Sequence, residues 1–186
     1  MVPLTSLWLP VLVSGVFVFL ASSIIHMVLP YHRSDYGRVP SEDDVMAALR
    51  KFAIPPGDYF LPAAGSPAEM RTPEYKKKME AGPLVLMTVL RQDGYAMGRR
   101  LTQWFLYTLV VSGLAGLVAG HAAGPLAPHH RIFHFAAIVA FAAYALALAQ
   151  DSIWYSRKWT TTAKSMFDGL VYAVITAGTF VWLWPR

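Results

Sequence analysis

Four long apolar segments follow one another along this chain of 186 residues, separated by polar stretches of unequal length. The segments cover residues 7–29, 104–123, 132–149 and 166–184. Each is close to the ~20 residues that an α-helix needs to cross the hydrocarbon core of a bilayer. The pattern therefore predicts an all-α membrane protein in which four transmembrane helices form one small bundle.

The connection between the first two segments is the only one long enough for a water-facing subdomain. Ser41 precedes three acidic residues and Thr72 precedes Pro73, and each pair predicts the capped start of a helix. The apolar residues 84–90 predict a strand, with a hairpin turn at 92–94. We expect three regions, namely a first transmembrane helix in residues 1–30, a small α+β cap in 31–100, and transmembrane helices two to four in 101–186.

The composition agrees with a membrane protein. Hydrophobic residues make up 55% of the chain and charged residues 15%, and the mean hydropathy is +0.41, whereas roughly a quarter of the residues in a soluble domain are charged. The formal net charge of +5 does not indicate nucleic acid, because basic residues beside spans orient membrane proteins and contact anionic headgroups. The absence of cysteine excludes thiolate metal ligands, iron–sulfur clusters and covalent c-type haem.

Lysine and arginine are distributed unequally between the two ends of the predicted helices. One end carries eight of them and the other carries two. The eight are Arg33, Arg38, Arg91, Arg99, Arg100, Arg157, Lys158 and Lys164, and the two are Arg131 and Arg186. Because these residues accumulate in cytoplasmic loops, we expect both termini in the periplasm of a bacterial inner membrane and residues 31–100 in the cytoplasm.

Small residues recur at four-residue spacing within the predicted spans. The second span contains Ser112, Gly116, Gly120 and Gly124, and the fourth contains Gly169, Ala173 and Ala177. Such stripes let two helix backbones approach closely. They predict helix packing, either inside the bundle or against another subunit.

Ionisable residues gather at the predicted cytoplasmic ends of the helices. His26, His32, Asp151 and Asp168 would together offer nitrogen and oxygen ligands suited to zinc, iron or manganese, or a path for protons. The alternative is a structural network of hydrogen bonds and ion pairs, for example between Asp168 and Lys164, and between Asp35 and an arginine of the loop. The sequence contains no ligand motif of fixed spacing that would decide between them.

A second group of histidines lies at the predicted periplasmic ends. His130 and His134 would share one face of the third helix, with His121 or His129 as a further ligand. Imidazoles in this arrangement could bind copper, zinc or a haem, although isolated histidines at helix ends are common interface residues. The predicted topology places this outer group and the inner group on opposite sides of the membrane, so they are two separate candidate sites.

Motifs of familiar enzymes and transporters are missing from the sequence. It has no Gly-rich phosphate loop, no His-Glu-x-x-His, no Gly-x-Ser-x-Gly and no inverted repeat. The sequence therefore leaves open whether the protein is an enzyme.

Three strings carry a resemblance to a known family. They are HMVLPYHRSDY at 26–36, GPLVLM at 82–87 and FDGL at 167–170. Together they resemble a family of small four-span bacterial inner-membrane proteins with no assigned function. The resemblance implies a bacterial inner membrane and brings no catalytic residue.

These patterns lead to one main hypothesis and two alternatives. The absent motifs, the packing stripes and the structured cap favour a non-catalytic accessory or structural subunit of a larger membrane complex. Its partners would be the lipid bilayer and other membrane subunits or further copies of itself. The alternatives are a membrane enzyme that binds a transition metal or haem through a histidine cluster, and a small oligomeric channel or transporter.

Overall fold

The computed structural model describes residues 1–91 and 96–185, and about 70% of it is helical. Four helical segments are long and apolar enough to cross a membrane, which confirms the expected number of candidate spans. They are Leu4–Met27, Met97–Ala122, His129–Trp154 and Trp159–Trp182. The chain divides into two compact units, one formed by Met1–Tyr36 with the residues from Met97 onward, and the other by Gly37–Ala96.

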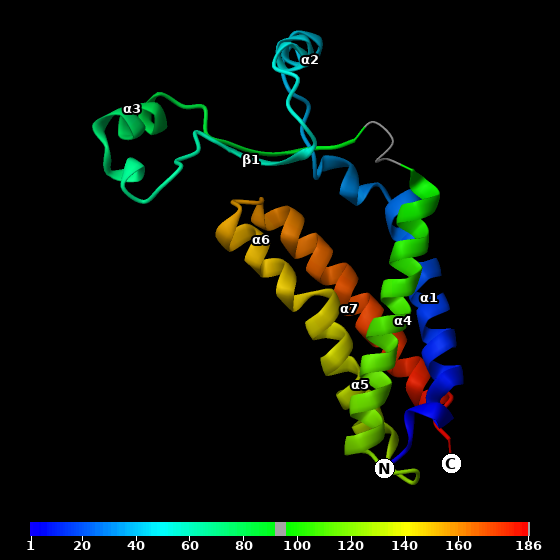
Figure 1. Cartoon of the computed structure of the whole chain (residues 1–186). Coiled ribbons are helices and arrows are strands. Elements are labelled where there is room, and N and C mark those ends of the chain that lie inside the picture. The colour runs from blue at the N-terminus through cyan, green and yellow to red at the C-terminus, as the bar shows by residue number, and fades with distance from the viewer. Residues whose placement is uncertain (92–95, 186) are drawn as a thin grey trace. The chain divides into compact units, whose positions relative to one another are not determined.

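The first unit is a bundle of helices that run alternately in opposite directions, with both termini at the same end (Figure 1). The 3-10 turn η1 precedes α1, η2 follows it, and η4 separates α5 from α6. The elements are η1 (Leu4–Leu7), α1 (Trp8–Met27), η2 (Pro30–Ser34), α4 (Met97–Ala122), α5 (His129–Tyr144), η4 (Leu146–Leu148), α6 (Ala149–Trp154) and α7 (Trp159–Trp182). The third span is thus interrupted, where the sequence predicts one continuous helix.

Small side chains lie where α4 meets its neighbours. The hydroxyl of Ser14 in α1 donates a 3.0 Å hydrogen bond to that of Ser112. A Cβ added to Gly116 would lie 3.0 Å from the ring of Phe180 in α7. At Gly120, a Cβ would lie 2.5 Å from a backbone carbonyl of the N-terminal segment, whereas at Gly124 it would meet no atom within 4 Å. Three of the four stripe positions therefore face neighbours within the bundle.

Small residues of α5 and the stripe of α7 also face the inside of the bundle. Ala136 and Ala140 of α5 are fully buried, and Ala173 and Ala177 of α7 are at most 1% exposed. Close approach of backbones across small side chains is the usual way in which membrane helices associate. The faces that carry these residues are consequently covered by the protein itself.

The second unit contains two helices and a two-stranded antiparallel sheet. Its elements are α2 (Glu42–Lys51), β1 (Gly57–Leu61), the 3-10 turn η3 (Glu69–Arg71), α3 (Pro73–Ala81) and β2 (Val85–Val89). The strands pair from Gly57 with Val89 to Leu61 with Val85. This gives the region α+β content, as the sequence predicts.

The local predictions in this unit have different outcomes. Thr72 caps α3 as expected, because its hydroxyl accepts a 3.2 Å hydrogen bond from the backbone N–H of Tyr75. The predicted cap of α2 is wrong, since Ser41 has a left-handed backbone (φ 49°) and its side chain caps no N–H. The predicted hairpin at 92–94 lies outside the described residues, and β2 pairs with β1, a segment for which the sequence analysis predicts no strand.

Candidate functional site

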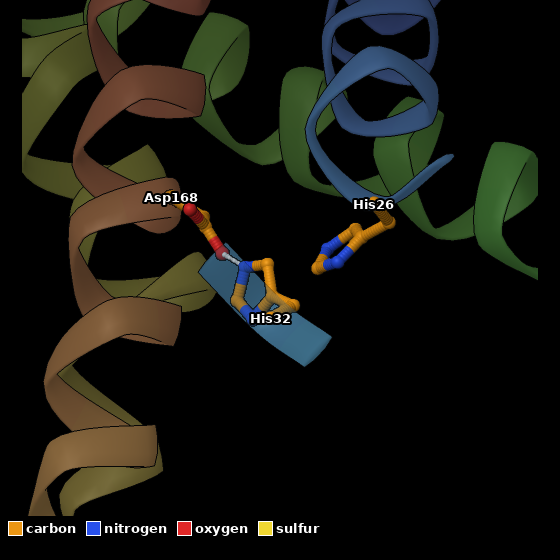
Figure 2. A group of neighbouring side chains, drawn as sticks. All are labelled: His26, His32 and Asp168. Carbon is orange, nitrogen blue, oxygen red and sulfur yellow. Dashed lines mark hydrogen bonds and ion pairs between the residues drawn. The ribbon is translucent and has the colours of Figure 1, made fainter. Parts of the chain in front are cut away.

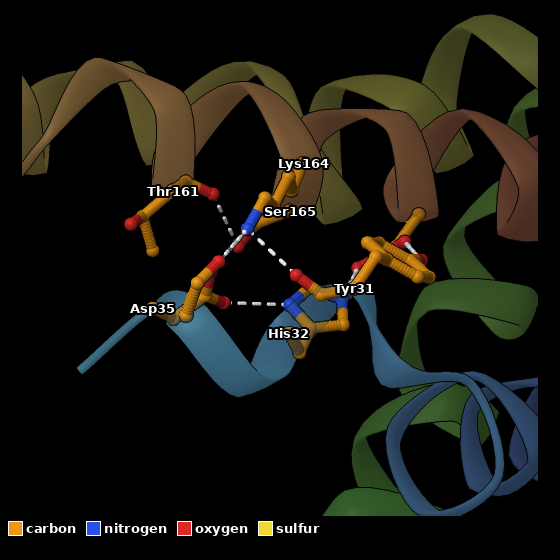
Figure 3. A network of polar contacts seen from close by, with 8 residues as sticks. Tyr31, His32, Asp35, Thr161, Lys164 and Ser165 are labelled. Carbon is orange, nitrogen blue, oxygen red and sulfur yellow. Dashed lines mark hydrogen bonds and ion pairs between the residues drawn. The ribbon is translucent and has the colours of Figure 1, made fainter. Parts of the chain in front are cut away.

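A polar site forms where the chain leaves α1 and lies beside α7. Pro30 begins the 3-10 turn η2 (Pro30–Ser34). The fixed φ of proline suits the first position of a helical turn. This turn brings Tyr31 and His32 against the first half of α7 (Figure 3). These residues therefore belong to the helical unit, and the second unit begins only at Gly37.

His32 lies between two carboxylates. Its Nδ1 is 2.6 Å from Oδ2 of Asp35, and its Nε2 is 2.8 Å from Oδ2 of Asp168. Asp168 is only 2% exposed, and its second oxygen accepts a hydrogen bond from the hydroxyl of Tyr31. A buried carboxylate is tolerated only when its oxygens have such partners, so His32 and Tyr31 account for the burial of Asp168.

Lys164 precedes Asp168 by one helical turn on α7, and its ammonium group also binds η2. Its Nζ donates to the backbone oxygen of Tyr31 at 2.6 Å, to Oγ of Ser34 at 2.9 Å and to Oδ1 of Asp35 at 2.9 Å. Three donors on one ammonium group match these three acceptors. The sequence-based pairing of Lys164 with Asp168 and of Asp35 with an arginine is therefore wrong, because η2 places Asp35 nearer to the ammonium group.

The protonation of two groups in the turn follows from these contacts. Burial alone would raise the pKa of Asp35, but hydrogen bonds from His32 and Lys164, together with the charge of Lys164, hold that pKa below its ordinary value. Burial raises the pKa of Tyr31, and its hydrogen bond to Asp168 raises it further. Asp35 is consequently an anion at neutral pH, and Tyr31 is a neutral hydrogen-bond donor.

His26 completes a group of three potential metal ligands. It lies in the last turn of α1 and its ring points toward His32, with Asp168 on the far side of His32 (Figure 2). The ring centroids of the two histidines are 4.5 Å apart. One ligand atom from each of His26, His32 and Asp168 lies within 4.8 Å of the others. Within residues 1–91 and 96–185, no other group of three or more such side chains comes together in this way.

One pair of the three ligand atoms already has the spacing found around a bound ion. Zinc lies about 2.0–2.2 Å from nitrogen and oxygen ligands, which places adjacent ligand atoms roughly 3 Å apart, and the 2.8 Å between His32 and Asp168 fits this spacing. Two ligands of one zinc ion lie at most about 4.4 Å apart, so binding within a group that spans up to 4.8 Å would require a small inward movement of the exposed His26 side chain. Asp35 on the opposite nitrogen of His32 resembles the carboxylate that usually orients a metal-binding histidine. The arrangement can thus act as a hydrogen-bonded clamp or as a metal site.

The fourth residue of the predicted inner set lies elsewhere. Asp151 is in α6, and its carboxylate pairs with Nη1 of Arg157 at 3.5 Å. Tyr31, which sequence reasoning missed as a site residue, is the second partner of Asp168. The only signal for it was its position directly before His32, at the end of a predicted span.

The outer histidines are more dispersed. The ring centroids of His130 and His134 are 6.3 Å apart, and both side chains are exposed on α5. Nδ1 of His121 lies 2.8 Å from the backbone oxygen of Leu117 in its own helix. With His129, these residues do not form a three-ligand group among the described residues.

Aromatic residues lie next to the inner site on the membrane-spanning side. Tyr172 follows Asp168 by one turn of α7, and its ring centroid is 5.5 Å from that of Tyr144 and 6.0 Å from that of Trp104. Nε1 of Trp104 donates a 2.7 Å hydrogen bond to Oγ of Ser22. The side chain of Tyr172 is buried, and no described residue accepts or donates a hydrogen bond at its hydroxyl. Trp104, Tyr144 and Tyr172 thus form an aromatic cluster one helical turn of α7 away from Asp168.

The sequence and fold were compared with known proteins in three ways. Comparisons with protein-family models, with curated proteins and with solved structures find no significant match.

Proposed function

We propose that this protein is a multi-pass membrane metalloprotein in which His26, His32 and Asp168 bind one divalent transition-metal ion. The observation that carries the proposal is the approach of their three ligand atoms to within 4.8 Å of one another. The distribution of lysine and arginine supports an orientation with both termini outside, which in a bacterial inner membrane is the periplasm and would place the site at the cytoplasmic boundary.

The chemistry of the ligand set supports a reactive site over a purely structural one. Two imidazoles and one carboxylate suit zinc, iron(II) or manganese(II). Structural zinc sites usually have four protein ligands, whereas three leave a position open for water or substrate. The carboxylate of Asp35 would orient His32, and the hydroxyl of Tyr31 would hold Asp168. A membrane enzyme that activates a metal-bound ligand is therefore the function that this geometry favours.

Metal analysis of the purified full-length chain tests the proposal. The side chain of His26 contacts the ring of His32 but makes no hydrogen bond to any described residue. His26→Ala should therefore remove a ligand without breaking the contacts of His32 and Asp168. We expect wild-type protein prepared without chelator, or loaded with zinc, iron(II) or manganese(II), to hold one equivalent of metal by mass spectrometry, and His26→Ala to lose most of it.

The matched control is His134→Ala, which removes another exposed histidine from the same helical unit. It should leave the metal content unchanged. A wild-type protein that takes up no equivalent of any of the three metals, or a His26→Ala variant that keeps a full equivalent, would overturn the proposal. Intact folding of both variants is checked by circular dichroism and gel filtration in detergent.

A second candidate function, an accessory subunit of a membrane complex, is favoured by one observation in the Gly37–Ala96 unit. A hollow of about 570 Å³ there has walls that include Met46, Leu49 and Ile54 on one side and Met87 and Val89 on the other. Apolar hollows of this kind often receive a side chain or helix of another protein. This role does not require the absence of a metal.

The accessory role is tested by purifying the protein from its own membrane. We expect a membrane subunit at fixed stoichiometry that is lost from the Leu49→Glu variant. It should be retained by Leu86→Glu, which alters an exposed leucine at a position of β2 that does not line the hollow. A wild-type chain that is monomeric and partnerless in mild detergent would argue against this role.

A further inference from the structure

We propose that a hollow between α1 and α4, beside His26, binds an acyl chain of an anionic phospholipid and presents its headgroup to the inner site. Lipid binding follows from the hollow itself. The inference that this lipid reaches a metal ion rests on the proposed function. It deepens that proposal by naming the ligand class as membrane phospholipid.

The hollow has a volume of about 460 Å³ and mostly apolar walls. Ser23, His26 and Met27 of α1 line one side, and Met97, Leu101 and Trp104 of α4 line the other. The indole N–H of Trp104 donates to Oγ of Ser22 at 2.7 Å, and that hydroxyl donates to the backbone oxygen of Phe19 at 2.8 Å. Some of the polar atoms in the wall are thus already hydrogen-bonded, and the remaining apolar surface suits a hydrocarbon chain.

The position of the hollow identifies its occupant. It lies between the last turns of one candidate span and the first turns of another, so acyl chains are the apolar molecules available there. Met27 and Met97 at its mouth are 76% and 59% exposed. A flexible thioether side chain adapts readily to an irregular chain.

The charge at the same end selects a headgroup. Arg33 is an exposed cation in η2, just beyond the end of α1. Arg99 adds a second exposed cation in the first turn of α4. Basic residues beside a cleft between membrane helices attract anionic headgroups. A phospholipid with a net negative headgroup therefore fits better than a zwitterionic one.

His26 connects this hollow to the inner site. It is both a wall of the hollow and one of the three potential metal ligands. A lipid whose chain fills the hollow would therefore have its phosphate or ester oxygens near the open position of a metal ion. The lipid is then a ligand of the site and not only a part of the surrounding bilayer.

The experiment uses the full-length protein in nanodiscs of phosphatidylcholine that contain a small fraction of phosphatidylglycerol with a photoreactive diazirine on one acyl chain. Mass spectrometry after illumination should find several-fold more label around Met97 and Leu101 than around Leu117. Leu101→Trp fills the hollow and should lower this labelling several-fold. Leu117→Trp is the control, because Leu117 is 40% exposed on the same helix and Leu101 is 36% exposed. It should not change the labelling around Met97 and Leu101.

Three results would overturn the lipid site. They are equal labelling around Leu101 and Leu117, labelling that is insensitive to Leu101→Trp, and equal labelling by a diazirine probe on phosphatidylcholine. Arg99→Gln should reduce the difference between the anionic and zwitterionic probes, because it removes an exposed cation at this end of α4.

A separate measurement distinguishes this inference from the metal proposal. Adding zinc should change the labelling of the wild-type protein and leave that of His26→Ala unchanged. If the wild-type chain binds no metal but labels as expected, the metal proposal fails and the lipid site stands. If it binds metal and zinc has no effect on labelling, the link between lipid and metal is overturned.

Discussion

Gly169 of α7 lies directly against the backbone of Tyr144 at the end of α5. A Cβ added at Gly169 would be 2.9 Å from the carbonyl carbon and oxygen of Tyr144, and 2.7 Å from Cβ of Ala145. The helical backbone of the third span is interrupted at this point, between α5 and η4. Because Asp168 is the preceding residue, this contact helps to set where the buried carboxylate of the inner site lies.

Gly169→Ala should therefore destabilise the bundle. Inserting a methyl group into a close backbone contact typically costs about 1–3 kcal/mol. We expect a lower midpoint of thermal unfolding in detergent, followed by tryptophan fluorescence. Gly178→Ala is the control on the same helix, because a Cβ there meets no atom within 4 Å. Equal stability of the two variants would show that the α5 and α7 backbones are further apart than described.

Lys164→Gln should loosen the turn η2 while the spans stay intact. The substitution removes an ammonium group that donates to Tyr31, Ser34 and Asp35. Hydrogen bonds to a charged group are worth about 1.5–3 kcal/mol when buried, and the 29% exposure of this side chain lowers the expected loss to about 1 kcal/mol. Hydrogen exchange measured by mass spectrometry should become faster in residues 28–36.

The control for this prediction is Lys158→Gln. Lys158 is exposed just before α7, and its charge is removed without altering the contacts of η2. Its exchange pattern should match the wild type. Unchanged exchange in residues 28–36 of Lys164→Gln would contradict the described clamp.

Gly120→Ala should release the N-terminal segment from α4. The backbone N–H of Val2 donates a 2.8 Å hydrogen bond to the carbonyl of Gly120, and an added Cβ at this position would lie 2.5 Å from the carbonyl oxygen of Val2. We expect faster hydrogen exchange at residues 1–6 and a lower thermal midpoint. Gly113→Ala, where a Cβ meets no atom within 4 Å, should show neither effect.

The orientation in the membrane can be tested with single cysteines, since the chain has none. Ala68→Cys lies at an exposed position of the Gly37–Ala96 unit. Leu126→Cys lies between α4 and α5, at a residue that is 91% exposed. From the distribution of lysine and arginine, we expect an impermeant maleimide to label Leu126→Cys in intact spheroplasts and Ala68→Cys only in inverted vesicles. The reverse pattern would invert the proposed topology.

The sequence by itself determined the four apolar helices and the presence of an α+β segment between the first two. Span-length hydropathy is a local property, because each membrane helix satisfies its own backbone hydrogen bonds and needs only a sufficient apolar length. Thr72 capped its helix as predicted for the same reason, since the cap involves neighbours only three residues apart. Ser41 did not cap α2 as predicted, because its left-handed backbone depends on the chain around it.

Only the tertiary structure decided which polar residues meet. His32 and Asp168 are 136 positions apart, and their approach depends on how η2 folds against α7 and on how α7 packs through Gly169. Their positions at the predicted ends of the spans made His26, His32, Asp151 and Asp168 equal candidates, whereas packing joined three of them and left Asp151 with Arg157. The partner of β2 also differs from the prediction: the sequence indicates a hairpin at 92–94, whereas β2 pairs with β1. Strand partners are chosen by contacts between distant segments, which a linear pattern does not specify.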